Sequence, residues 1–218
     1  MNTKNPIKVH DEYADTYDAS VKEYHSHLHE LLFGMCYEFI QPGDSLLDIG
    51  IGTGLSSVNF ARAGVDVYGM DPSSNMIEQC RKKGFAKELK QHSLTDPPLP
   101  YHDKAFSHVI ACGVFHFFGR LDVYIDEACR VLQDRGIFAL TVATPGQGEM
   151  NSDSDSWVEV RTQWGLSLYK HGDVYIERQL RRCALEPLKY QRILQKGGAR
   201  KDIVFTVVVS RKISGSAS

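Results

Sequence analysis

Several common sequence features are missing from this 218-residue chain, and each absence argues against a class of protein. The first ten residues hold no apolar segment of the kind that a secretory signal needs. No run of about 18 apolar residues follows that could cross a membrane. Basic and acidic side chains nearly balance, at 25 and 27, which disfavours an extended surface for nucleic acid. These absences predict a cytoplasmic protein with neither a membrane nor a nucleic-acid partner.

Cysteine is also scarce, and its spacing argues against a disulfide framework. The cysteines are odd in number, lie far apart and show no C-x-x-C pair, so buried reduced thiols are expected. His25 and His29 would lie one turn apart on a helix, but no third ligand stands at a matching position. No metal site is therefore predicted. The five cysteines are Cys36, Cys80, Cys112, Cys129 and Cys183.

The hydrophobic pattern alternates between strand-like runs and helical segments, which predicts an α/β fold with a mostly parallel sheet. Seven segments are expected to form strands: residues 45–49, 65–70, 86–91, 105–112, 136–142, 188–194 and 203–210. Four segments between them are expected to form helices: residues 55–63, 73–83, 122–133 and 174–183.

The two ends of the chain differ from this central alternation. Apolar residues at spacings of three and four over residues 13–40 predict amphipathic helices. We therefore expect a helical cap over residues 1–40, one domain over residues 41–212 and a disordered tail over residues 213–218. The stretch 144–156 is rich in Gly, Ser and Asp and is long for a compact domain, so a lid and a disordered loop both remain open.

The most informative segment is Asp48-Ile49-Gly50-Ile51-Gly52-Thr53-Gly54, which follows the first predicted strand. Glycines at such a point let the backbone turn sharply and let a ligand approach closely. A phosphate-binding P-loop would need a lysine after its last glycine, and none is present. The dinucleotide pattern G-x-G-x-x-G also fails, because Leu55 and Ser57 stand where its third glycine belongs.

An acid followed by three alternating glycines instead suits a ligand with an amino-acid end. Asp48 can hold a positively charged amino group, and the glycine amides can meet a carboxylate. A pyrophosphate would be repelled by a carboxylate so close to the turn. Asp71 ends the second predicted strand, 23 residues after Asp48, near the separation of roughly 20 residues at which a carboxylate meets a ribose.

These residues resemble the motifs of class I S-adenosylmethionine-dependent methyltransferases, over roughly residues 40–143. The resemblance implies a Rossmann-like, doubly wound, mostly parallel seven-stranded sheet with a reversed last strand and an N-terminal helical cap. It implies S-adenosylmethionine as cofactor, with Asp48 and the turn at its methionine end and Asp71 on its ribose hydroxyls. The glycines of the turn are Gly50, Gly52 and Gly54.

Other cofactor contacts follow from the same resemblance. Pro72 continues the ribose motif, Met76 matches a methionine near the adenine, and Cys112 lies in the apolar stretch after the fourth strand. The family often places an acid on the adenine amine, but this sequence has no acid there. Backbone groups of Ser93 and Leu94 are expected to substitute. Tyr17, in the cap, could offer its hydroxyl to the methionine end or its ring to the sulfonium.

The function implied is transfer of a methyl group to an O, N or C atom of a small-molecule acceptor. His116, after the fourth strand, and His171, before the last helix, are the candidate bases because imidazole titrates near neutral pH. Two alternatives remain open: a protein or RNA methyltransferase, and a non-catalytic S-adenosylmethionine-binding protein. A nicotinamide oxidoreductase is disfavoured by the glycine spacing. The sequence does not indicate an oligomeric state.

Overall fold

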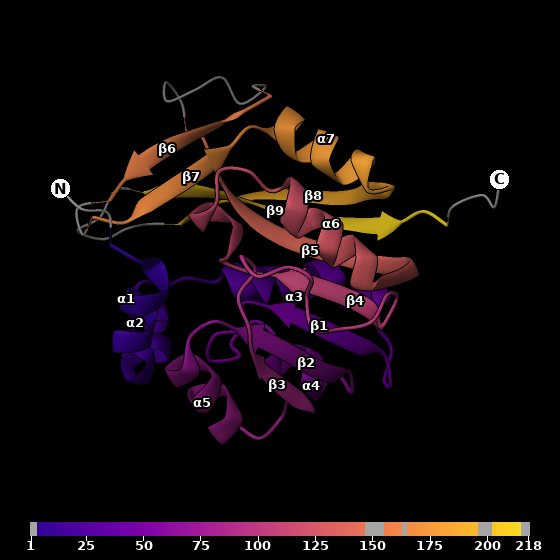
Figure 1. Ribbon diagram of the computed structural model, residues 1–218, viewed down its shortest axis with the longest axis horizontal. Helices are drawn as coiled ribbons and strands as arrows, with labels where there is room; N and C mark the ends of the chain where they lie inside the picture. The colour runs from indigo at the N-terminus through magenta and orange to yellow at the C-terminus, as the bar shows by residue number, and fades with distance from the viewer. Residues whose placement is uncertain (1–3, 147–154, 163–164, 196–201, 215–218) are drawn as a thin grey trace.

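A single mixed sheet dominates the computed structural model, which describes residues 4–146, 155–162, 165–195 and 202–214 (Figure 1). Within these ranges nine strands form the sheet, in the order β3-β2-β1-β4-β5-β7-β6, and β9 pairs with both β5 and β8. The strands are β1 (Ser45–Ile49), β2 (Asp66–Asp71), β3 (Glu88–Gln91), β4 (Phe106–Ala111), β5 (Leu132–Thr144), β6 (Trp157–Arg161), β7 (Ser167–His171), β8 (Leu185–Gln195) and β9 (Ile203–Lys212).

Helices cover both faces of the sheet. The α-helices are α1 (Pro6–Glu12), α2 (Tyr17–Glu23), α3 (Leu28–Cys36), α4 (Val58–Arg62), α5 (Ser74–Lys82), α6 (Asp122–Val131) and α7 (Asp173–Arg182). Three short 3₁₀ helices join them, η1 (Ala14–Thr16), η2 (Tyr37–Phe39) and η3 (Phe115–Phe117). Buried residues of α6 and α7 share one hydrophobic cluster, and those of α3, α4 and α5 share the other. The sheet between them is buried on both sides, which is why its central strands are nearly continuous apolar runs.

The predicted fold class is confirmed. All seven predicted strands are present, as β1 to β5, β8 and β9. The central pairs β2–β1, β1–β4 and β4–β5 are parallel, whereas β9 runs antiparallel to β5 and is the reversed last strand.

The strand count is a correction, because β6 and β7 were not predicted. They form an antiparallel hairpin that joins β5 through one residue pair, Ala143 and Lys170. Polar and apolar residues alternate in β6, where Val158 and Val160 flank Glu159. Only five residues carry this period-two pattern, which is too short a run to distinguish a strand from the connection between β5 and α7.

The N-terminal region forms several short helices rather than one or two longer ones. In Figure 1, α1 and α2 lie beside α5, and both α1 and η1 contact that helix. Helix α3 instead packs on the sheet against β5 and β9. The domain division at residue 40 stays a prediction. Most of the predicted loop 144–156 and the tail lie outside the described residues, at 147–154 and 215–218.

No helix in the described ranges is long and apolar enough to cross a membrane. The parallel strands β1, β2, β4 and β5 all end at one edge of the sheet. In an open sheet of this kind, ligands bind beyond the carboxyl ends of the strands. Most of the predicted site residues lie at that edge, and the segments that cover it are the N-terminal helices, η3 and the β6–β7 hairpin.

Candidate functional site at the carboxyl ends of the strands

The three glycines after β1 all adopt positive φ, at +72° for Gly50, +53° for Gly52 and +87° for Gly54. A Cβ on Gly50 would lie 2.4 Å from Val114, and one on Gly54 would lie 2.6 Å from the Phe85 ring. A Cβ on Gly52 would meet nothing within 4 Å. Packing therefore requires two of the glycines, whereas Gly52 borders open space that a ligand can enter.

The amides of this turn are engaged within the protein. Gly50 N and Ile51 N donate to Met70 O at 2.8 and 3.0 Å, and Gly54 N donates to Ile51 O at 2.8 Å. Gly52 N donates to Asp71 Oδ2 at 2.9 Å. In this conformation the three glycine amides are thus not free to meet a ligand carboxylate, the role expected of them. Their bonds tie the turn to the end of β2.

Asp48, near the end of β1, is fully buried and only half satisfied. Its Oδ2 accepts a 2.6 Å hydrogen bond from Ser57 Oγ, while Oδ1 has no hydrogen-bond partner among the residues that the structure describes. Burial raises the pKa of Asp48 to about 7, and the nearby charge of Asp71 adds to the rise. An unpartnered carboxylate oxygen in this setting fits a cationic donor such as an ammonium group. Ser57 was not predicted as part of the site.

Asp71 ends β2 and is 9% exposed. Its two oxygens accept amide hydrogen bonds from Gly52 and Ser73, both at 2.9 Å. Burial raises the pKa of Asp71 to about 6, although the two amide bonds oppose the rise. Each oxygen keeps a second lone pair, so a pair of hydroxyl groups can still donate to this carboxylate. Pro72 follows directly, and Ser73 caps α5 by accepting from Met76 N at 3.1 Å.

Two carboxylates of the N-terminal segment attach it to these elements. Asp18 Oδ1 accepts from Thr53 Oγ1 in the glycine turn at 2.5 Å, and Asp18 Oδ2 pairs with Lys83. Asp11 Oδ1 accepts from Ser73 Oγ at 2.6 Å and from Asn75 N at 3.0 Å. The expected cap therefore lies over the site. Asp11 and Asp18 themselves were not predicted, and they lie on different helices, α1 and α2.

Tyr17, the first residue of α2, belongs to this segment. Burial raises the pKa of its hydroxyl, and the neighbouring Tyr13 adds to the rise. The ring centroid of Tyr13 is 5.8 Å away, and that of His10 is 6.3 Å away. Tyr17 thus lies in a group of rings that includes His10, which the sequence did not indicate.

The remaining predicted cofactor residues border the same edge. His92 N donates to Asp71 O at 3.1 Å, which sets Ser93 and Leu94 beside the end of β2. Leu94 is 6% exposed and packs into the core. Burial raises the pKa of Cys112 to about 12, so this thiol stays protonated at neutral pH.

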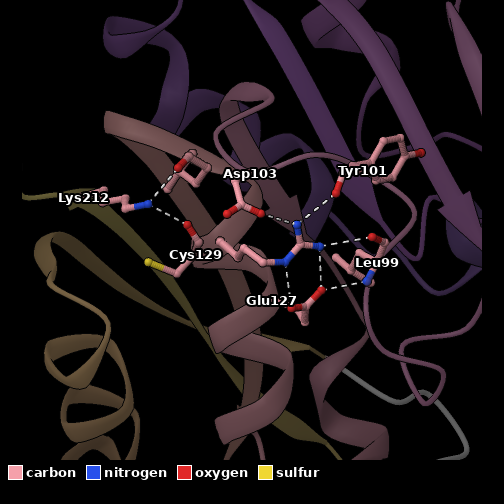
Figure 2. A network of polar contacts seen from close by, with 8 residues as sticks. Leu99, Tyr101, Asp103, Glu127, Cys129 and Lys212 are labelled. Carbon is pink, nitrogen blue, oxygen red and sulfur yellow. Dashed lines mark hydrogen bonds and ion pairs between the residues drawn. The ribbon is translucent and has the colours of Figure 1, made fainter.

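The loop between β3 and β4 is held by Arg130 of α6, a residue that was not predicted as part of the site. Its partners Leu99, Tyr101, Asp103 and Glu127 are labelled in Figure 2. It donates to Glu127 through Nε and Nη2 at 2.8 Å, to Asp103 at 2.8 Å, and to the carbonyls of Tyr101 and Leu99 at 2.9 and 3.1 Å. Glu127 also accepts from Leu99 N at 2.7 Å. The network fixes the chain that follows Ser93 and Leu94.

His116 lies in η3, directly after β4. Its Nδ1 is buried without a partner, and its ring lies 4.2 Å from Phe117 and 5.6 Å from Phe205, centroid to centroid. Burial lowers the pKa of His116 to about 3, and the nearby His10 and His171 add to the fall. The imidazole is uncharged at neutral pH.

His171, at the end of β7, is fully buried and has a defined tautomer. Its Nε2 lies 3.0 Å from both Phe118 O and Gly119 O. Carbonyl oxygens only accept, so Nε2 carries the proton and Nδ1 keeps a lone pair, which has no partner. Burial lowers the pKa of His171 to about 4. The two predicted histidines are thus brought close together as neutral hydrogen-bonding groups.

No group of three or more metal-ligating side chains is present among the residues that the structure describes. His25 lies between α2 and α3 with a φ of +48°, so it does not share a helix with His29.

Known proteins share much of this sequence and fold. Residues 47–140 match the family model described as a methyltransferase domain. Demethylmenaquinone methyltransferase of Tropheryma whipplei is 30% identical over 97 residues, which cover 44% of this chain and 41% of that enzyme. Malonyl-[acyl-carrier protein] O-methyltransferase of Legionella pneumophila is 28% identical over 182 residues, which cover 81% of this chain and 61% of that enzyme. The chain spans less than two thirds of the length of these relatives.

A solved structure extends the likeness to nearly the whole chain. The 1,6-didemethyltoxoflavin-N1-methyltransferase of Burkholderia thailandensis, with bound 1,6-didemethyltoxoflavin and S-adenosylhomocysteine, matches with a TM-score of 0.71. The match covers 98% of this chain and 93% of that one at 12% identity, so it establishes a common fold.

Proposed function

This chain contains a class I S-adenosylmethionine-dependent methyltransferase domain, and from that premise we propose that it transfers a methyl group to an O, N or C atom of a small molecule. The observation that carries the proposal is the pair of buried carboxylates around the glycine turn. Asp48 presents an unpartnered oxygen, and Asp71 is pinned to Gly52 at the end of the next strand. Two acids in these positions can bind the two ends of S-adenosylmethionine, its amino group and its ribose hydroxyls.

Each end of the cofactor then has its own contacts. Asp48 Oδ1 receives the ammonium group, and Asp71 receives the ribose hydroxyls. The open side of Gly52 admits the ligand backbone between them. Met76 and the chain at Ser93 and Leu94 would hold the adenine, and Cys112 would contact the nucleoside. Tyr17 closes the site from above, with its ring available to the sulfonium cation.

The bound cofactor supplies a methyl group that its sulfonium already activates for displacement. The protein has to align the acceptor and to handle its proton. His116 and His171 are uncharged at neutral pH, so either can accept a hydrogen bond from an O–H or N–H of the acceptor. Loss of turnover on replacing either histidine by alanine, with cofactor affinity retained, is the expected result. Full turnover in the double variant would exclude both as bases.

Aromatic rings surround these two histidines. Phe117 and Phe205 flank His116, and Tyr175 stacks on His171 at 5.6 Å, with Trp157 a further 5.3 Å from Tyr175. Pockets for small ligands are lined mainly by such apolar and aromatic groups. This setting supports a small, largely apolar acceptor. The names of the relatives in quinone and toxoflavin methylation are in keeping with that class.

Calorimetric titration with S-adenosylmethionine and S-adenosylhomocysteine tests the proposal, with Asp71→Ala beside the unchanged protein. We expect binding that the variant loses while circular dichroism shows it folded. Absence of binding to the unchanged, folded protein would overturn the proposal. Binding without release of S-adenosylhomocysteine, across a panel of small hydroxyl, amine and carbon acceptors, would instead favour a non-catalytic binding protein.

A further inference from the structure

Two of the five cysteines meet on the side of the sheet that α6 and α7 cover. Cys129 lies in the last turn of α6, and Cys183 directly follows α7. Cys129 Sγ lies 3.0 Å from Cys183 O. Cys183 Sγ lies 3.0 Å from Asp126 Oδ1, one helical turn before Cys129. Both cysteines are partly exposed. The expectation of buried thiols is therefore wrong for this pair, whose members are distant in sequence but adjacent in the fold.

The surroundings of the two thiols shift their pKa values in opposite directions. The adjacent Cys183 side chain lowers the pKa of Cys129 to about 7, and the Lys212 ammonium contributes to the fall. Figure 2 shows Lys212 Nζ donating to the Cys129 carbonyl, at 2.7 Å. The neighbouring Cys129 side chain raises the pKa of Cys183, and Asp126, which accepts from the Cys183 thiol at 3.0 Å, raises it further. Cys129 is therefore the more acidic thiol of the pair, and Cys183 keeps its proton.

The other three cysteines lack this arrangement. Cys36 and Cys80 are 1% and 0% exposed, and burial raises the pKa of each to about 12. Cys112 shares their raised pKa and belongs to the cofactor edge. A thiolate is the reactive form of cysteine, so reactivity is expected at Cys129 alone among the five. The adjacent Cys183 thiol supplies a partner for a second step.

We propose that Cys129 and Cys183 are an oxidisable dithiol, a modification site for hydrogen peroxide and related two-electron oxidants, which closes into a disulfide between the ends of α6 and α7. The Cys129 thiolate attacks one peroxide oxygen, the O–O bond breaks, and a sulfenic acid and hydroxide form. The Cys183 sulfur then attacks the Cys129 sulfur, the S–S bond forms and water leaves with the Cys183 proton. The hydroxide takes up the proton that Cys129 released, so two thiols and one peroxide give one disulfide and two waters.

Treatment of the full-length protein with hydrogen peroxide, followed by intact mass and peptide mapping without reductant, tests the proposal. We expect the loss of two hydrogens and a peptide that links Cys129 to Cys183. The cross-link should be absent from Cys129→Ser and Cys183→Ser and retained in Cys112→Ser. Oxygen addition to Cys129 without a cross-link, or a cross-link between other cysteines, would overturn it. The mapping of the unchanged protein decides the matter even where a serine variant folds poorly.

Alkylation kinetics provide a second test, which does not depend on formation of the cross-link. At pH 7 a thiol with a pKa near 7 carries roughly tenfold more thiolate than an ordinary thiol with a pKa of about 8.5. Cys129 should accordingly react with iodoacetamide several-fold faster than a short unstructured cysteine peptide, and its rate should fall in Cys183→Ser. Equal rates for Cys129 and the peptide would contradict the assigned pairing. Neither experiment depends on methyl transfer, so the dithiol and the proposed function can fail separately.

Discussion

The protonation of Asp48 links the candidate site to the stability of the protein. Burial raises its pKa to about 7 in the folded state, above the unfolded value, so the native state binds the extra proton. The stability that this proton contributes is present below the unfolded pKa and is lost as the pH rises through about 7. His116 and His171 act in the opposite sense, because burial lowers their pKa values and protonation at acid pH favours unfolding.

We therefore predict a pH-dependent difference between the unchanged protein and Asp48→Asn, since both share the two histidines. The thermal midpoint of the unchanged protein, measured relative to the variant, should fall between pH 5 and pH 8. A fall of at least about 2–4 °C is expected, which is the shift that roughly 1 kcal/mol produces in a protein of this size. Scanning calorimetry at several pH values measures it. A difference that stays constant across this range would contradict the raised pKa.

Alanine variants of the glycines in the turn can distinguish the cost of a strained backbone from the loss of space for the ligand. Gly52→Ala places a Cβ in open space, so stability should fall only by about 1–2 kcal/mol, the cost of a left-handed φ in an alanine. The same Cβ would occupy the side on which the ligand approaches, so affinity for S-adenosylhomocysteine should fall at least roughly tenfold, or about 1.4 kcal/mol. Calorimetric titration measures the affinity, and thermal unfolding measures the stability.

Gly43→Ala is the matched control. Gly43 has a φ of +89° and equally open surroundings, but it precedes β1 at the opposite end of the strand. It should show a similar loss of stability with unchanged affinity. Gly50→Ala should be the least stable of the three, because its Cβ would overlap Val114. If the Gly43 and Gly52 variants bind S-adenosylhomocysteine with equal affinity, the ligand does not occupy the open space beside Gly52.

At this scale, the residues found from the sequence were those within a local motif. Asp48 and the glycines could be recognised because they are contiguous, and Asp71 because it ends the next strand. Ser57, Asp11 and Asp18 could not, since their role comes from side chains that meet across the fold, such as Asp18 and Thr53. Neither motif nor period signals such a contact.

Among the elements, helix α2 depends on one carboxylate for its position over the site. Asp18→Ala removes its bonds to Thr53 and Lys83 together, so residues 17–23 should exchange amide hydrogens faster and cofactor affinity should fall several-fold. Hydrogen-exchange mass spectrometry measures the first effect and titration the second. Asp15→Ala is the control, because Asp15 bonds only to exposed Gln79 and should change little. Equal effects from both variants would argue against a specific role for Asp18.

The loop before β4 depends in the same way on α6. Arg130→Lys keeps the charge but cannot reproduce the planar set of bonds to Glu127, Asp103 and two carbonyls. We expect a loss of about 2 kcal/mol, from net contributions of roughly 1 kcal/mol for each bond not replaced. Faster exchange of residues 93–103 should accompany a lower thermal midpoint. A stable variant with unchanged exchange would show that the loop is held by its apolar contacts instead.

For the molecule as a whole, ligand binding should stabilise the folded state by mass action. At a hundredfold excess of S-adenosylhomocysteine over its Kd, the gain is about 2.7 kcal/mol, which corresponds to roughly 5–10 °C in the thermal midpoint. The midpoint should keep rising with the logarithm of ligand concentration, and Asp71→Ala should show no rise. Differential scanning fluorimetry measures both. A midpoint independent of ligand, in a protein that binds by calorimetry, would contradict a site formed only in the folded state.

The global architecture followed from strands and helices that alternate in sequence, because parallel strands need helical crossovers. The β6–β7 hairpin escaped prediction at this scale as well. Its two strands are five residues each, too short to carry a long apolar run, and β7 pairs with β5 at Ala143 and Lys170. The meeting of Cys129 with Cys183 was equally hidden, since 54 residues separate them along the chain.

The single ladder pair between β7 and β5 has a consequence for how the sequence of the hairpin can vary. The seven other strands pair with one another without it, and the proposed cofactor residues lie outside it, on those strands, on the segments that follow them and, for Tyr17, on α2. Exchange of residues 157–171 for the equivalent segment of a relative would leave the sheet intact while replacing Trp157 and His171. If this segment lines the acceptor pocket as proposed, such an exchange should change acceptor preference while the affinity for S-adenosylhomocysteine stays the same.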